Sequence, residues 1–296
     1  MLESLDLELI RLQLNCKNKV DHLLSGMYRS VFKGRGLEFD EVRPYQSGDD
    51  VRSIDWNVTA RSGQPYIKRY HEERECSIMF LVDVSASCDY ASGEKSKRDL
   101  MTIFCAHMAF AALRNNDRTG LLLFSDTVES YTPPLKGKSG VMRILQDIMT
   151  FDSQSEKTHL AQALDFFAKL QHKRSIVFVL SDFQDEDYWE ELSILAVHHE
   201  LVVVCINDLR EKELPASGLV KFKDMETGEE HLADLSEKRA RNLFKEKQSE
   251  WFDSLQQKFT DNGLDHLMIS SDDDILEKIL AFFHERERRV ADESGG

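Results

Sequence analysis

The chain has 296 residues, of which 41% are hydrophobic and 31% charged, with 14 glycines and 5 prolines. This composition is typical of a folded globular protein and excludes disordered, collagen-like and mucin-like chains. The formal net charge is −15, from 38 basic and 53 acidic residues, which opposes binding to nucleic-acid phosphates.

No segment predicts membrane insertion or export. The longest apolar runs, such as residues 201–206, are far shorter than the ~20 residues that cross a bilayer. The first residues lack the cationic start and apolar block of a signal peptide, so we expect a cytoplasmic protein without a transmembrane segment.

The cysteines are odd in number and form no C-x-x-C pair, which favours reduced thiols. They are Cys16, Cys76, Cys88, Cys105 and Cys205.

The sequence pattern divides the chain into an N-terminal unit, residues 1–75, and a main domain, residues 76–296. Helical spacing of leucines predicts a first helix that ends at about His22. Glycine-punctuated, charge-rich sequence follows, with extended pieces near residues 38–45 and 65–71. We therefore expect a small lobe of strands and loops after the first helix.

Opposite charges alternate along this lobe between Arg43 and Arg61. Two interpretations remain open. The charges can form an ion-pair network that joins the lobe to the main domain, or they can form a surface that docks a protein partner. For the second interpretation, the candidate contact residues are Arg52, Asp55 and Trp56.

In the main domain, apolar runs of five or six residues alternate with segments of helical period. Such strands are buried on both faces, and helical crossovers between them favour parallel pairing. The expected strands are Ile78–Val82, Gly120–Phe124, Ile176–Leu180, Leu201–Ile206 and His266–Ser270. The expected helices are Lys97–Leu113, Val141–Met149, Leu160–Leu170, Tyr188–His198, Ser236–Asn262 and Ile275–Arg288, with a hairpin at Lys221–Leu232. The predicted fold class is α/β, with a doubly wound, mostly parallel sheet.

Four of the predicted strands run directly into oxygen-bearing side chains. These follow as Asp83-Val84-Ser85-Ala86-Ser87, Ser125-Asp126, Ser181-Asp182 and Asn207-Asp208. Any one of these groups is explained by capping of the next helix. Because the carboxyl ends of parallel strands share one edge, where such folds bind ligands, all four together favour a ligand site.

The spacing of Asp83, Ser85 and Ser87 lets one carboxylate and two hydroxyls converge from a single loop. These are the hard oxygen ligands that Mg²⁺ or Mn²⁺ prefers. An ion held by one carboxylate and neutral hydroxyls keeps positive charge and open coordination positions. The loop therefore predicts a receptor for an acidic group.

The order of these motifs resembles a von Willebrand factor A domain with its metal-ion-dependent adhesion site. The resemblance implies a Rossmann-like fold and a ligand set of Asp83, Ser85, Ser87, Thr158 in KTHLAQAL and Asp182 in LSDF. Lys157 stands where the family commonly has a small residue. We expect it to point outward and attract the acidic group of a partner.

The sequence GRGLEFDEVRPYQSGDDVRSIDWNVTARSGQPYIKRYHEERE, ahead of DVSAS, is similar to the domain-of-unknown-function 58 family of bacteria and archaea. The likeness continues through RNNDRTGLLLFSD, the acidic hairpin and FFHERERR. It implies a cytoplasmic or membrane-associated protein linked to MoxR-type AAA+ ATPases. Such systems are associated with the assembly or activation of metalloenzymes and other complexes.

The sequence therefore favours a non-catalytic, magnesium-dependent interaction module that acts as adaptor for a MoxR-type AAA+ ATPase or its client. An alternative is a magnesium-dependent phosphohydrolase with Asp83 as nucleophile. Its pattern is D-x-D, and here Ser85 occupies the place of the second acid. A third possibility is a structural scaffold whose metal site, at the carboxyl edge of the sheet, binds no ion. The zinc-protease, Walker A and nucleophile-elbow motifs are all incomplete.

Overall fold

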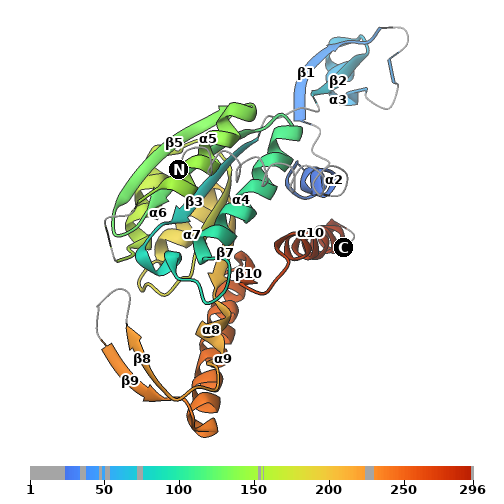
Figure 1. Ribbon diagram of the computed structural model, residues 1–296. Coiled ribbons are helices and arrows are strands. Elements are labelled where there is room, and N and C mark those ends of the chain that lie inside the picture. Colours follow the sequence, from blue (N-terminus) through green and yellow to red (C-terminus); the bar gives the residue numbers. More distant parts are fainter. Residues whose placement is uncertain are drawn as a thin grey trace.

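The computed structural model has a central sheet with helices on both faces, and an arm and a small lobe extend from opposite ends (Figure 1). The structure describes residues 24–33, 38–46, 49–50, 54–71, 76–152, 155, 157–223 and 230–294. The predicted first helix, up to about His22, lies outside these residues.

Six strands form the central sheet, and five of them coincide with predicted strands. They are β3 (Ser77–Asp83), β4 (Arg118–Phe124), β5 (Val128–Lys136), β6 (Ile176–Ser181), β7 (Glu200–Asn207) and β10 (Asp265–Ser270). Their order across the sheet is β10-β7-β6-β3-β4-β5, and every neighbouring pair is parallel except β4 and β5. The prediction of a doubly wound, mostly parallel α/β sheet is confirmed.

Helices pack on both faces of this sheet. One face is covered by α2 (Leu24–Tyr28), α4 (Lys97–Arg114), α5 (Lys138–Thr150) and α10 (Ile275–Ser294). The other face is covered by α6 (Leu160–Leu170), α7 (Trp189–His198) and α9 (Lys238–Asp261). Shorter turns are η1 (Arg29–Lys33), η3 (Ala86–Asp89) and α8 (Leu209–Lys212). The six helices predicted for the main domain are present, and the last one runs beyond its predicted end at Arg288.

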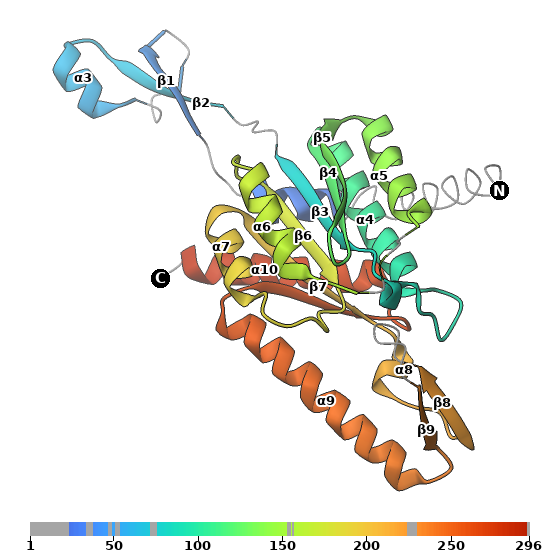
Figure 2. The same ribbon diagram turned by 90° about the vertical axis from the view of Figure 1, so that its left-hand side faces the viewer.

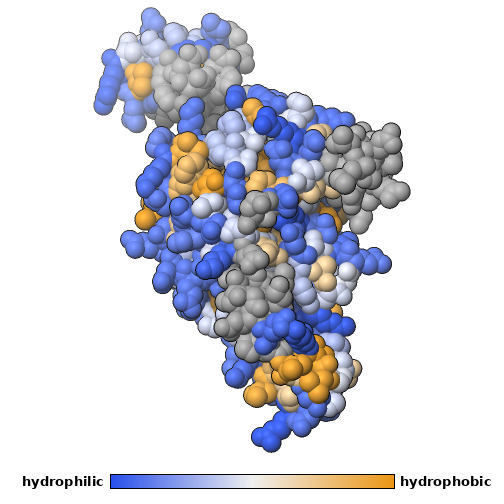
Figure 3. All heavy atoms as spheres, turned by 60° about the vertical axis from the view of Figure 1, so that its left-hand side comes forward, coloured by the Kyte–Doolittle hydropathy of each residue, from blue (hydrophilic) through white to orange (hydrophobic). Residues whose placement is uncertain are grey.

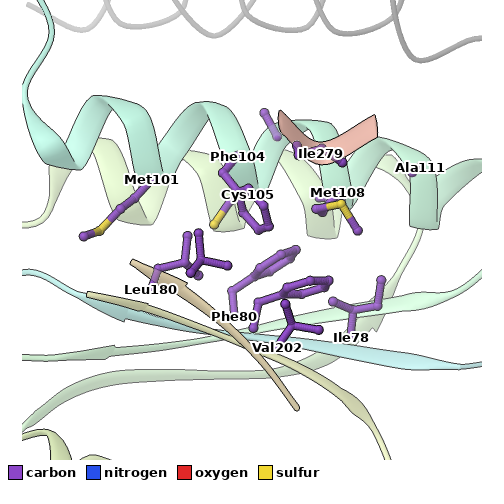
Figure 4. Close-up of a cluster of buried hydrophobic side chains, with 14 of the residues drawn as sticks. Ile78, Phe80, Met101, Phe104, Cys105, Met108, Ala111, Leu180, Val202 and Ile279 are labelled. Atoms are coloured by element: carbon purple, nitrogen blue, oxygen red, sulfur yellow. The ribbon is translucent and has the colours of Figure 1, made fainter. Parts of the chain in front are cut away.

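The core consists of two hydrophobic clusters, one on each face of the sheet. Alternate residues of a strand point to opposite faces, so Phe80 of β3 enters the first cluster while its neighbour Leu81 enters the second. Figure 4 shows Met101, Phe104 and Met108 of α4 above the strand side chains of the first cluster. These three side chains belong to the hydrophobic core, as their helical spacing indicates.

Strand β5 was not predicted from the sequence. It contains Pro133 and Pro134, which disfavour a strand because proline has no N–H to donate. The structure places β5 at the edge of the sheet, antiparallel to β4, with two shifts of register. An edge strand has a neighbour on one side only, so the two prolines are tolerated there.

The lobe contains a helix in addition to the expected strands. Strands β1 (Glu38–Pro44) and β2 (Tyr66–His71) pair antiparallel, and α3 (Trp56–Ser62) lies between them in the chain. The Asp55 carboxylate starts α3 by accepting hydrogen bonds from the backbone N–H groups of residues 57 and 58. This local cap produces a helix where the sequence pattern predicted only strands and loops.

An arm is inserted between β7 and β10. We define the arm as α8, the hairpin of β8 (Leu219–Lys223) and β9 (Glu230–Asp234), and α9. Both the hairpin and the long helix were predicted, and residues 224–229 between the two strands lie outside the described residues. Figure 2 shows α8 and the hairpin extending past the end of β7. The arm therefore starts at the carboxyl edge of the sheet.

The length and composition of a helix decide whether it could span a membrane. Within the described residues, none combines the length and the apolar character needed to cross a bilayer.

Gly120 of β4 provides a test of this packing. A Cβ atom at this position would lie 2.5 Å from the Sδ atom of Met79 and 2.9 Å from the backbone oxygen of Thr132. Gly120→Ala should therefore lower the free energy of unfolding by about 1–3 kcal/mol. Chemical denaturation measures this change. Gly93→Ala is the control, because a Cβ there meets no atom within 4 Å; equal stabilities of the two variants would contradict the packing argument.

Candidate functional site

The candidate site forms where two neighbouring parallel strands end. Asp83 is the last residue of β3, and Ser181 is the last residue of β6, with Asp182 directly after it. Strands β3 and β6 pair in register from Ile78 to Val82. This pairing brings the two aspartates, far apart in the sequence, to the same edge of the sheet.

Asp83 is fully buried. Its Oδ1 atom accepts a hydrogen bond from the backbone N–H of Ser85 at 2.9 Å, and its Oδ2 atom accepts one from the hydroxyl of Ser181 at 2.7 Å. Burial raises the pKa of Asp83 to about 6, and repulsion from Asp182 adds to this rise. A charge at Asp83 is therefore costly unless a cation accompanies it.

The serine hydroxyls connect the first loop to Asp182. Ser87 donates to Oδ2 of Asp182 at 3.0 Å, and the Oγ atoms of Ser85 and Ser87 lie 3.1 Å apart. The short helix η3 begins after Ser85 and holds both serines over the end of β3. The structure thus brings together four of the five predicted ligands, Asp83, Ser85, Ser87 and Asp182.

Thr158, the fifth predicted ligand, precedes α6 at the same edge. The next residue, His159, donates its backbone N–H to Ser125, which follows β4. The backbone N–H of Leu160 donates to Asp185, which lies in the loop after β6. Within the described residues, the Thr158 hydroxyl is buried without a hydrogen-bond partner, so it is available to a ligand between these loops.

Sequence reasoning missed Lys97, a buried lysine beside the site. Its Nζ atom lies 2.7 Å from Oδ2 of Asp182 and 2.6 Å from Oε1 of Glu211, and the residue is 1% exposed. Burial alone would lower its pKa, but the two carboxylates outweigh burial and raise the pKa above its usual value. Lys97 is therefore charged and compensates Asp182. The sequence pattern does not reveal this burial, because most lysines in the first turn of a helix are exposed to solvent.

Two buried thiols adjoin these oxygen atoms. The Sγ atom of Cys88 lies 3.7 Å from the Ser85 hydroxyl, and Cys205 donates to the backbone oxygen of Asp182 at 3.7 Å. Burial raises the pKa of both thiols, so they remain protonated. The four described cysteines are free, which agrees with the predicted reduced thiols.

The predicted partner contacts lie in different places. Lys157 is exposed beside Thr158, and Trp56 is 68% exposed on the lobe. Asp55 is mostly buried and caps α3. Arg52 lies outside the described residues. In the lobe, Arg43 pairs with Asp49 at 2.7 Å, so an ion pair does form there, and docking by these residues stays a prediction.

The chemistry of the site suits a hard cation. Among the described residues, no three or more His, Cys, Asp or Glu side chains gather as a metal-binding group. The candidate donors are instead two carboxylates and three hydroxyls, a set of oxygen atoms that fits Mg²⁺ or Mn²⁺ better than zinc or copper.

Comparison with known proteins places the chain among uncharacterized sequences. A family model described as "Protein of unknown function DUF58" matches residues 41–251. Two uncharacterized proteins, from Mycobacterium bovis and Mycobacterium tuberculosis, are each 32% identical over 220 residues, 73% of this chain and 69% of theirs. None of these descriptions states an activity, so the functional argument rests on the site.

Two solved structures are similar in part. The conserved hypothetical protein BatB from Bacteroides thetaiotaomicron has a TM-score of 0.45 and 11% identity, covering 72% of this chain and 99% of that one. Proximal thread matrix protein 1 from the mussel byssus, solved with a zinc-occupied MIDAS motif, has a TM-score of 0.37 and 18% identity. It covers 46% of this chain and 39% of that one.

The raised pKa of Asp83 predicts a pH-dependent stability. As pH rises, the unfolded chain loses this proton first, so the folded state loses stability until the pH passes about 6. Asp83→Asn removes this titration. In EDTA, the variant should therefore gain about 2–3 kcal/mol of unfolding free energy relative to the wild type between pH 4 and pH 7.

Denaturant unfolding across this pH range measures the gain. Asp165→Asn, at an exposed position of α6, is the control and should show no comparable gain. A difference between Asp83→Asn and wild type that stays constant with pH would contradict the buried carboxylate.

Proposed function

Since the chain belongs to the family of unknown function DUF58, we propose from its site chemistry that it is a magnesium-dependent protein-interaction module. A Mg²⁺ or Mn²⁺ ion would be held by Asp83, Ser85, Ser87, Thr158 and Asp182. When bound, the ion would supply a hard positive centre with open coordination positions. An acidic side chain of a protein partner would bind there.

The observation that carries this proposal is the buried hydroxyl of Thr158, which has no hydrogen-bond partner among the described residues. Its segment is hydrogen-bonded to the loops after β4 and β6. A buried hydroxyl without a partner is unfavourable. A cation between Thr158 and Asp83 would satisfy this oxygen. The fit agrees with the metal-ion-dependent adhesion site that the resemblance to von Willebrand factor A-like domains implies.

Charge balance favours a divalent ion. In the part of the chain that the structure describes, the carboxylates of Asp83, Asp182 and Glu211 are accompanied by one ammonium group, that of Lys97, which pairs with Asp182 and Glu211. With all three carboxylates ionised, this cluster has a net charge of −2, and one divalent cation would neutralise it. Among the described residues, the hydrogen-bond donors to Asp83 are both neutral, Ser85 and Ser181. The ion would therefore balance the charge of Asp83.

The partner is proposed to be a MoxR-type AAA+ ATPase or its client, with this chain as adaptor in the assembly or activation of a protein complex or metalloenzyme. In this arrangement residues 76–296 carry the metal edge, by which we mean the carboxyl edge of the sheet with the five proposed ligands. Residues 1–75 offer the exposed Trp56 as a second contact. Lys157, exposed beside the edge, would attract the acidic group of the partner by long-range electrostatics.

Calorimetry tests the metal site directly. Asp83→Ala should abolish Mg²⁺ binding while circular dichroism stays native. Ser181→Ala keeps every proposed ligand but removes the hydroxyl that orients Asp83, so it should weaken Mg²⁺ binding by about 10–100-fold. Asp165→Ala, on the exposed face of α6, is the control. Unchanged Mg²⁺ affinity in Asp83→Ala would refute the metal site.

Affinity capture from a native extract tests the partner class. The wild-type chain in Mg²⁺ should retain an AAA+ ATPase of the MoxR type, and EDTA or Asp83→Ala should release it. The same protein should not hydrolyse ATP or generic phosphate esters. Turnover of a phosphate ester that Asp83→Ala abolishes would instead support the phosphohydrolase.

A further inference from the structure

We infer that a cavity beside the metal edge takes an apolar side chain from an acidic segment of the partner. This inference rests on the proposed function, because it assigns a second contact to the same docking site. The cavity has a volume of ≈ 330 Å³ and lies between the loop after β6 and the long helix α9. Its lining residues are Gln184, Glu211, Phe244, Gln248 and Trp251.

Hydrogen bonds and ion pairs join the cavity to the candidate site. The backbone N–H of Gln184 donates to Oδ1 of Asp182 at 3.3 Å. Glu211 and Asp182 share the ammonium group of Lys97, at 2.6 and 2.7 Å. Two of the lining residues thus contact groups of the metal edge, so a single short segment of a partner can reach both places.

The lining suits an apolar anchor with polar surroundings. Phe244, Gln248 and Trp251 follow one another at intervals of four and three residues on α9, which places them on one helix face. Trp251 is 37% exposed, and its ring packs edge-on against buried Phe252 at 4.8 Å between centroids. Supported aromatic side chains in a small cavity are typical of the anchor positions of protein interfaces.

The charge of α9, the helix that supplies three of the lining residues, favours an acidic segment. Residues 238–247 of α9 contain five basic residues and one acid, a net charge of +4 in a chain of net charge −15. Lys247 is exposed and lies three residues after Phe244 and four before Trp251, so it borders the cavity. Glu211, the carboxylate in the lining, shares the ammonium group of Lys97 with Asp182. A basic segment would be repelled by this part of α9.

The arm carries further exposed apolar surface. Leu219 and Leu232 of the hairpin are 72% and 71% exposed. They are diagonal neighbours on one face, because Lys221, two residues after Leu219, pairs with Leu232. Figure 3 shows an apolar patch at the lower end of the molecule, where the hairpin lies. Exposed apolar patches of this kind mark protein-interaction surfaces, and the arm is thus suited to extend the contact.

Binding of labelled peptides tests the inference. The probe is a short fluorescein-labelled peptide of glutamates around one phenylalanine, measured by fluorescence anisotropy in Mg²⁺. Two reference peptides replace phenylalanine by serine, or every glutamate by lysine. The acidic phenylalanine peptide should bind most tightly, and Trp251→Ala should weaken its binding by about tenfold or more.

Lys247→Glu keeps the aromatic lining but reverses the charge at its border, at an exposed helix position. It should weaken binding of the acidic peptide, most strongly at low salt. Lys138→Glu, an exposed lysine at the start of α5, is the matched control and should bind like wild type. Neither Trp251→Ala nor Lys247→Glu should change the Mg²⁺ affinity measured by calorimetry.

The outcomes separate the inference from the proposed function. If Asp83→Ala abolishes peptide binding while Trp251→Ala and Lys247→Glu leave it unchanged, the cavity contact is refuted and the metal site stands. If those two variants weaken binding but EDTA and Asp83→Ala do not, the cavity stands and the metal-dependent function falls. Equal binding of the serine-containing peptide would also refute the apolar anchor.

Discussion

The parallel pairing of β3 with β6 is the constraint on which the site depends. It places Asp83 and Asp182, two carboxylates, side by side at a buried edge of the sheet. Burial, and then repulsion from Asp182, raise the pKa of Asp83 and so oppose its ionisation. Asp182 is stabilised by the ammonium group of Lys97, which pairs with it, and by the hydroxyl of Ser87, which donates a hydrogen bond to it. The donors to Asp83 among the described residues are neutral, which is why we propose that a metal ion supplies the missing positive charge.

Lys97 also connects this edge to the arm. Besides Asp182 it holds Glu211 of α8, and Glu211 accepts the backbone N–H of Asp208 at the start of that helix. Breaking the buried pair would leave an uncompensated charge, which is strongly unfavourable. The first turn of the arm is therefore fixed relative to Asp182. Glu211 lines the cavity together with the aromatic residues of α9, which are thus within reach of the partner segment that we propose to bind at the metal edge.

The family match spans residues 41–251. This range includes part of the lobe, all five proposed ligands and the cavity residues up to Trp251. The arm and the lobe leave the sheet at opposite ends (Figure 1), so a partner that contacts both must pass along the molecule. Of these two extensions, the arm has the direct side-chain link to the site.

The sequence by itself determined five of the six strands of the sheet, the helices of the main domain and which residues meet at the carboxyl edge. Continuous apolar runs require burial on both faces, and parallel strands bring residues such as Asp83 and Asp182 to one edge whatever the details of packing. The edge strand β5 could not be predicted, because Pro133 and Pro134 disfavour a strand in the sequence pattern. The prolines are tolerated because β5 has a neighbouring strand on one side only, and the sequence does not show this position.

Only the tertiary structure decided that Lys97 is buried and that Gln184 and Trp251 line one cavity. A lysine at a helix start has the same local pattern whether it is solvated or paired. Its state here is set by where α8 brings Glu211. Contacts between segments so distant in the sequence depend on how helices pack against the sheet, and no local spacing encodes that packing.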